Sequence, residues 1–172
     1  MRKLIATTFI VLCVALAVPQ DTKAQSYSNS LSADPLGLAF GMLNATFESR
    51  VGAQNSFTLF GSYYTSTYLA DWTAFGFGGS YRWYFDINDG KRPIQGLSAG
   101  PFIAFSFWSW GGPSWINYDN SLAVAIGGEG AYKWVFGGFV VEPYLRLALP
   151  ITKGDGITYR GYGLGCNLGF AW

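Results

Sequence analysis

The chain has 172 residues, of which 50% are hydrophobic, 19% are aromatic and only 12% are charged. This charged share is about half of that in an ordinary soluble domain. Beyond the first residues, no apolar run reaches the ~20 residues that a membrane-spanning helix requires. The 23 glycines and 7 prolines also disfavour a helical bundle. A closed sheet is favoured instead, because only helices and closed barrels satisfy every backbone group in lipid. The net charge of +1 gives no sign of a nucleic-acid partner.

The first 24 residues have the pattern of a secretory leader. Arg2 and Lys3 precede an apolar stretch over residues 4–18, and the small residues Thr22 and Ala24 predict cleavage after Ala24. A retained N-terminal anchor is the alternative interpretation. We therefore expect a signal peptide at 1–24 and one exported domain at 25–172. In that domain Cys166 is the only cysteine, so neither an internal disulfide nor a cysteine metal cluster is expected.

From residue 36 onward, apolar residues alternate with small or polar ones, which is the pattern of β-strands. In residues 139–149, for example, Leu145 and Leu147 share one face while Glu142 and Arg146 share the other. The polar phase is largely Gly, Ser and Ala, which suits a narrow barrel interior. Spans of ~9–11 residues match tilted membrane strands. We predict an all-β fold, an antiparallel transmembrane β-barrel, with a soluble sandwich or lipocalin-like barrel as the alternative.

The pattern yields about seven clear strand segments, whereas single-chain bacterial barrels have an even number of strands, eight at the small end. The eighth strand is therefore expected within residues 26–48. Residues 34–41 precede a clearer alternating run at 43–48, and Gly41 between them permits a sharp bend.

The pair Gly137-Gly138 lies between two alternating runs and predicts a two-residue hairpin turn. This register sets Lys133 opposite Glu142 and Glu129 opposite Arg146, two pairs of opposite charge on the interior phase. Glu48 and Arg82 share the interior phase of their own strands, and we expect them to extend this polar group. The pairs are interpreted as structural salt bridges that hold the register; a polar relay or ion path along the interior is the alternative.

Short turns are typical of the periplasmic end of such barrels, so the Gly137-Gly138 turn is placed there. Counting strands from this turn puts the connections 64–72, 109–119 and 150–157 outside. Blocks at 81–85 and 132–134 come just before turns, where aromatic rings form an interface girdle. The middle external connection is rich in aromatic residues and is a candidate contact surface for a partner or glycan, with interface anchoring as the alternative: Trp108, Trp110, Trp115 and Tyr118.

Four short motifs carry a resemblance to a known group: 34–38 (DPLGL), 81–85 (YRWYF), 100–102 (GPF) and 130–136 (GAYKWVF). With them, the chain resembles small outer-membrane β-barrel proteins of the outer-membrane-protein-X and outer-membrane-protein-A barrel type, and more closely an uncharacterised branch of that group. The resemblance implies residence in the outer membrane of a Gram-negative-type envelope, in contact with its lipid and lipopolysaccharide. It also implies a C-terminal signal for the barrel assembly machinery at Leu168, Phe170 and Trp172, where the group usually ends in Phe.

The resemblance supplies no catalytic residues, and we expect no enzyme activity, no metal and no cofactor. The favoured function is a structural, surface-contact or adhesion role, with the external ligand left open. A lipid A- or phospholipid-modifying enzyme is one alternative, but the chain contains no histidine, the usual general base near neutral pH. A narrow ion-conducting pore is the other, and eight strands leave an interior that side chains fill.

Overall fold

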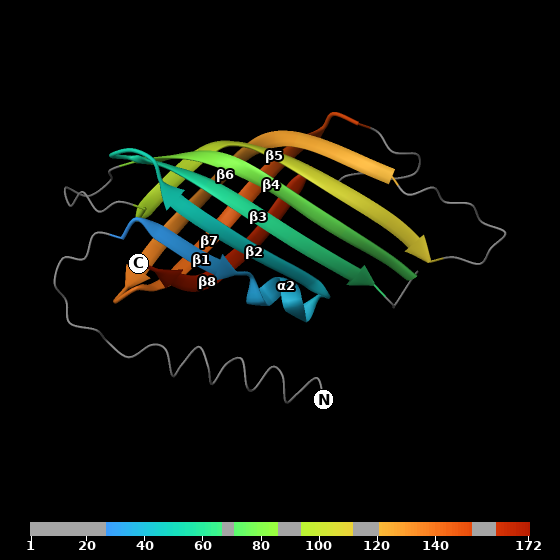
Figure 1. The fold of residues 1–172 in the computed structure, drawn as a ribbon, viewed down its shortest axis with the longest axis horizontal. Helices are drawn as coiled ribbons and strands as arrows, with labels where there is room; N and C mark the ends of the chain where they lie inside the picture. Colours follow the sequence, from blue (N-terminus) through green and yellow to red (C-terminus); the bar gives the residue numbers. More distant parts are fainter. Residues whose placement is uncertain (1–26, 67–70, 86–93, 112–120, 153–160) are drawn as a thin grey trace.

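The computed structural model describes residues 27–66, 71–85, 94–152 except 112–120, and 161–172. The predicted leader at 1–24 lies outside these residues. The chain forms one closed antiparallel barrel of eight strands with a single short helix (Figure 1). The elements, in chain order, are β1 (Asn29–Ala33), α2 (Pro35–Ala39), β2 (Met42–Arg50), β3 (Asn55–Ser66), β4 (Asp71–Phe85), β5 (Gly96–Gly111), β6 (Ser121–Phe136), β7 (Phe139–Pro150) and β8 (Tyr162–Ala171).

Each strand pairs with the next along the chain, and β8 pairs with β1 to close the barrel. The last residue strengthens this seam: the Trp172 carbonyl accepts hydrogen bonds from the backbone N–H groups of Ser28 (2.9 Å) and Asn29 (3.0 Å). Closure leaves no open sheet edge along the paired length, which is how a barrel satisfies its backbone polar groups. The predicted all-β, antiparallel, eight-stranded barrel is confirmed.

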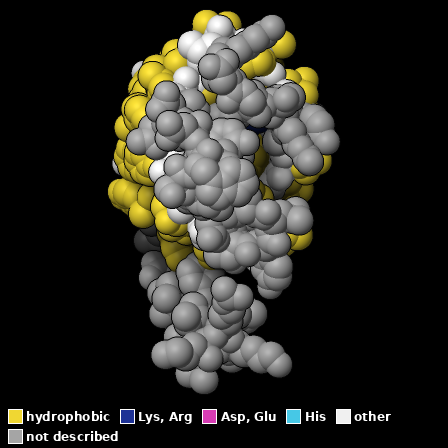
Figure 2. Space-filling view, turned by 90° about the vertical axis from the view of Figure 1, so that its right-hand side faces the viewer, with side chains coloured by type: hydrophobic (Ala, Val, Ile, Leu, Met, Phe, Trp, Pro, Cys, Tyr) yellow, Lys and Arg dark blue, Asp and Glu magenta, His cyan; other side chains and the backbone are white. Residues whose placement is uncertain are grey.

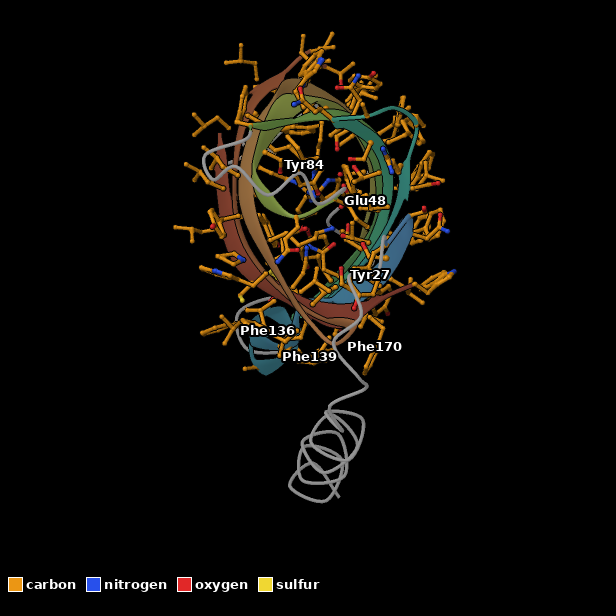
Figure 3. The ribbon with its side chains drawn as sticks, turned by 90° about the vertical axis from the view of Figure 1, so that its left-hand side faces the viewer. Tyr27, Glu48, Tyr84, Phe136, Phe139 and Phe170 are labelled. Atoms are coloured by element: carbon orange, nitrogen blue, oxygen red, sulfur yellow. The ribbon has the colours of Figure 1, made fainter. Side chains whose placement is uncertain are left out.

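The two faces of the wall differ as the alternation predicted, with the apolar phase outward. Phe75, Leu145 and Leu164 are 53%, 44% and 78% exposed, whereas Arg82 and Glu142 are 0% and 1% exposed. Figure 2, which looks onto one end of the barrel, shows hydrophobic side chains covering the visible flanks. Figure 3 shows the opposite end, with Tyr84 and Glu48 inside the ring and Phe136, Phe139 and Phe170 outside it. A soluble barrel would bury its apolar phase, so this wall is inverted relative to a soluble fold.

The eighth strand is β1, and it lies within the predicted interval 26–48. Alternation does not begin at residue 36, however, because residues 35–39 form helix α2 rather than a strand. The local sequence explains the difference. Asp34 caps the helix by accepting from the backbone N–H groups of Leu36 and Gly37, and Pro35 fits the first helical turn. Gly41 then turns the chain into β2 with a positive φ of 77°.

The connections alternate between the two ends of the barrel. The Gly137-Gly138 turn shares its end with both Ser28 and Trp172, and we call this the turn end. The strand order places the three predicted outer connections together at the opposite end. Their bounds were too wide, because strand pairing continues to Ser66 in β3, through Gly111 in β5 and to Pro150 in β7. The connection after β1, which contains α2, lies at the opposite end as well.

Two adjacent glycines of β6 provide a matched test of how tightly the interior is packed. A Cβ at Gly127 would overlap the Leu147 carbonyl and lie 2.8 Å from the Phe102 ring, whereas at Gly128 the nearest atom would be 4.0 Å away. Gly127→Ala should therefore lower the free energy of unfolding by about 1–3 kcal/mol through overpacking. Gly128→Ala should stay within about 0.5 kcal/mol of the parent. Urea unfolding followed by tryptophan fluorescence measures both; equal losses would contradict this packing.

Candidate functional site: the charged interior

The β6–β7 hairpin has the register that the sequence predicted. Gly137 and Gly138 both have positive φ, 57° and 93°, as a two-residue turn of the primed type requires. Glu129 pairs with Arg146 and Phe136 with Phe139 across the two strands. The predicted register of this hairpin is confirmed.

The two charged pairs of the hairpin meet inside the barrel. Lys133 Nζ lies 2.9 Å from Glu142 Oε2, and Arg146 Nε donates to Glu129 Oε2 at 2.8 Å. Three of these side chains are at most 4% exposed, while Arg146 is partly buried. Because each pair joins neighbouring strands, it opposes a slip of the register, which would turn these charges to the outer face.

Arg82 of β4 reaches across the interior and joins these pairs into one network. Its guanidinium lies 2.5 Å from Glu129 Oε1, 3.2 Å from Glu48 Oε2 and 3.1 Å from Glu142 Oε1. Lys133 Nζ also donates to Glu48. The three glutamates come from β2, β6 and β7, so one cation ties together strands far apart around the wall. We call the six residues the charged cluster: Glu48, Arg82, Glu129, Lys133, Glu142 and Arg146.

The charged cluster is electrically balanced, with three cations and three carboxylates. Neutral groups satisfy more of its oxygens: Tyr84 Oη donates to Glu48 Oε1 at 2.7 Å, and Asn167 Nδ2 donates to Glu142 Oε1 at 3.2 Å. Lys133 Nζ additionally donates to Ser30 Oγ at 3.0 Å. Burying charges is costly unless partners compensate them, and here every carboxylate has a cation and a neutral donor.

Apolar layers lie on both sides of the charged cluster. Toward the turn end, Tyr84, Ile94, Val135, Val140 and Ala171 pack together, with Tyr27 against them. On the other side, Phe60 and Phe102 pack with small residues at Ala104, Ala125 and Ala148. The Arg146 guanidinium lies over the Phe60 ring, 4.0 Å from its centroid. The described interior is therefore a stack of packed layers, with the ions in the middle one.

Sequence reasoning found the six charged residues but not their neutral partners. Tyr84 lies on the interior phase of the aromatic block 81–85, and alternation within that block would have separated it from Tyr81 and Trp83. Asn167 occupies a polar position among the glycines of β8, which is a signal of the same kind. A second polar group, formed by Asp34, Asn44 and Tyr144, joins residues up to 110 positions apart and has no local signature.

Two of the four residues predicted in an outer contact loop are strand residues. Trp108 and Trp110 lie within β5, where their backbones pair with Ala74 and Trp72 of β4. The prediction of a loop at these two residues was wrong. Both neighbours of β5, β4 and β6, are long, so β5 finds pairing partners farther from the turn end than the sequence pattern indicated. Trp115 and Tyr118 lie outside the described residues.

The C-terminal residues with the predicted assembly signal close the barrel. Leu168 pairs with Ala33 of β1 and with Val141 of β7. Phe170 packs edge-on against Phe139, with ring centroids 5.8 Å apart, and Trp172 lies 6.4 Å from Phe47. Outward aromatic side chains at the C-terminus thus contact β7 through Phe139 and β2 through Phe47.

Within the described ranges, no group of three or more His, Cys, Asp or Glu side chains is arranged to hold a metal ion. In the same ranges, no helix combines the length and apolarity needed to cross a bilayer.

Charge reversal tests the hairpin pairs. Glu129→Lys would set a third cation beside Arg82 and Arg146, and we expect a loss of about 3–5 kcal/mol in the free energy of unfolding. Adding Arg146→Glu should recover part of this loss, because the 129–146 pair is restored while the contact with Arg82 is not. Urea titration of both variants measures the effect. Additive losses in the double variant would contradict the pairing.

Comparison of the chain with protein-family models, with curated proteins and with solved structures finds no match.

Proposed function

We propose that this chain is an integral outer-membrane β-barrel with a structural, surface-contact or adhesion role and without catalysis. The observation that carries the proposal is the inversion of the wall. Large apolar side chains face outward around the barrel, while all six members of the charged cluster face inward. In water such a surface promotes aggregation, whereas in acyl chains it is the favourable arrangement.

Aromatic pairs near the turn end support membrane insertion. Tyr81 and Trp83 have ring centroids 5.1 Å apart, and Tyr132 and Trp134 have centroids 4.6 Å apart. Both pairs lie on outward positions close to where their strands end. Amphipathic rings prefer the boundary between headgroups and hydrocarbon, so these pairs suit an interface girdle.

Export, location and partners complete the proposal. The leader pattern at 1–24 supports export, and the apolar outer wall would then contact outer-membrane lipid and lipopolysaccharide. The alternating C-terminal strand with Trp172 at its end is consistent with recognition by the barrel assembly machinery.

The two alternatives are less well supported. An outer-membrane lipid-modifying enzyme would need a general base, yet the chain has no histidine, and the glutamates of the charged cluster are engaged by cations. An ion-conducting pore would need an open path, whereas packed apolar layers flank the charged cluster on both sides.

Membrane insertion is tested by electrophoretic mobility before and after boiling, on protein refolded into lipid vesicles. A folded barrel should migrate differently before boiling. Leu145→Arg, on the outer wall, should lower the stability in vesicles by about 2–4 kcal/mol, because the charge would face hydrocarbon. Ile151→Arg is the matched control: this residue is 58% exposed just beyond β7, and a cost of only about 0–1 kcal/mol is expected near an interface.

Identical mobility with and without boiling would reject the membrane barrel. Equal losses of stability for Leu145→Arg and Ile151→Arg would contradict the placement of Leu145 beside hydrocarbon and of Ile151 near the interface.

The same vesicle-refolded protein separates the alternatives. In planar bilayers we expect no stable single-channel steps, and on incubation with labelled lipid A or phospholipid we expect no turnover. Stable conductance steps would replace the structural role with a pore, and turnover would replace it with an enzyme.

A further inference from the structure

The apolar layer that closes the turn end contains one residue that does not belong to a strand. Its other buried members lie on β4, β6, β7 and β8: Tyr84, Val135, Val140 and Ala171. Ile94 instead precedes the first residue of β5, Gly96, yet it is only 2% exposed. Its side chain therefore joins the layer from the end of the barrel rather than from the wall. We call these five residues the turn-end layer.

The backbone of Ile94 has a conformation that its side chain disfavours. Its φ is 49°, and every other positive φ among the described residues belongs to a glycine. A β-branched side chain is a genuine outlier in this left-handed region, and such a conformation persists only where the surrounding structure holds it. Gly96, with a φ of 99°, is a second left-handed position two residues later. Residues 94–96 thus form a strained kink.

Gln95, inside this kink, adds a polar cost. Its Oε1 atom is buried and has no hydrogen-bond partner among the described residues. A buried acceptor without a donor raises the free energy of the conformation that buries it. Backbone strain at Ile94 and the unsatisfied amide of Gln95 both oppose this conformation, whereas burial of the Ile94 side chain favours it. Segments with such opposed contributions open locally at a lower free energy than strand residues, which the sheet holds on both sides.

The turn-end layer lies directly against the charged cluster. Tyr84, a member of the layer, donates from Oη to Glu48 Oε1 of the cluster at 2.7 Å. Figure 3 looks onto this end and shows both residues inside the ring of strands. Gly96, at the end of the kink, pairs through its backbone with Lys133, another member of the cluster. A layer without Ile94 would therefore leave the cluster less well separated from the turn end.

We propose that residues 94–96 are a latch: Ile94 reversibly closes the turn end of the barrel, and its release admits water from that end to Tyr84 and Glu48. The strand members of the turn-end layer keep their places when the latch opens. The apolar layer on the other side of the charged cluster stays closed, so the release hydrates the interior from one end without opening a path through the barrel.

Thiol labelling of a buried reporter tests the latch. Val140 is 0% exposed in the turn-end layer, and Val140→Cys in the full chain with Cys13→Ser and Cys166→Ser carries the single thiol. The folded protein in detergent micelles is reacted with a water-soluble maleimide, and attachment is followed by mass spectrometry. The thiol reacts only while it is accessible, so the labelling rate reports the population of the open latch.

Gly96→Ala strains the latch without removing any atom of Ile94. An alanine at a φ of 99° is disfavoured, while its Cβ would still lie 3.9 Å from the nearest atom, the Phe85 carbonyl oxygen. We expect labelling to rise about tenfold, because the closed latch alone bears the added strain. Gly128→Ala is the matched control: its φ is not positive, its nearest atom would be 4.0 Å away, and the rate should stay within about twofold of the parent.

Ile94→Gly removes the closing side chain itself and should raise labelling by at least about tenfold. A second reporter, Ala125→Cys, lies in the apolar layer on the other side of the charged cluster and is 1% exposed in the parent. Its labelling should stay unchanged in both latch variants. Heat-modifiable mobility shows that each variant is folded, and the two latch variants test the proposal independently.

Unchanged labelling of the Val140→Cys reporter in the folded latch variants would overturn the proposal. An equal rise at the Ala125→Cys reporter would also overturn it, because the whole barrel would then be opening rather than its turn end. A Val140→Cys thiol that reacts in the parent as fast as in urea-unfolded protein would show that Ile94 closes nothing.

Discussion

The structure depends on one buried arginine and the three carboxylates that it contacts. Arg82 meets Glu48, Glu129 and Glu142, which come from three different strands, so the wall can close only in a register that brings all four together. A slip of one residue in any of these strands would turn its charge to the outer face. In the proposed membrane, an arginine or lysine turned to the outer face would face hydrocarbon, at a cost of about 2–4 kcal/mol in stability. The charged cluster therefore selects a register as well as stabilising it.

The narrow interior leaves little room for any other use of these charges. Their partners are one another, together with Tyr84, Asn167 and small hydroxyl side chains, and apolar layers lie on either side. A network that compensates itself in this way resists opening, because separating any one ion would leave its partners buried and unpaired. This self-compensation favours the structural role that we propose for the interior.

The wall is less regular where β1 ends at Ala33 and the short helix α2 follows. There Asp34 caps α2 and also accepts from Tyr144 Oη, while Asn44 Nδ2 donates to the same hydroxyl. This second polar group joins β2, β7 and the segment between β1 and α2 on the other side of the charged cluster from the turn end. Arg146 lies between the two groups: its Nε donates to Glu129, and its guanidinium is 5.0 Å from the centroid of the Tyr144 ring.

The sequence by itself determined which residues face outward, since alternation assigns a face to every residue of a strand without knowledge of its neighbours. It also determined the β6–β7 register, because Gly137-Gly138 permits a two-residue turn and so sets Glu129 opposite Arg146. The extent of β5 through Trp108 and Trp110 and the contacts of Arg82 and Tyr144 were decided only by the tertiary structure. Pairing length, the height of the wall and contacts across the interior depend on how eight tilted strands close, and closure joins residues as far apart as Asp34 and Tyr144. No local pattern carries that information.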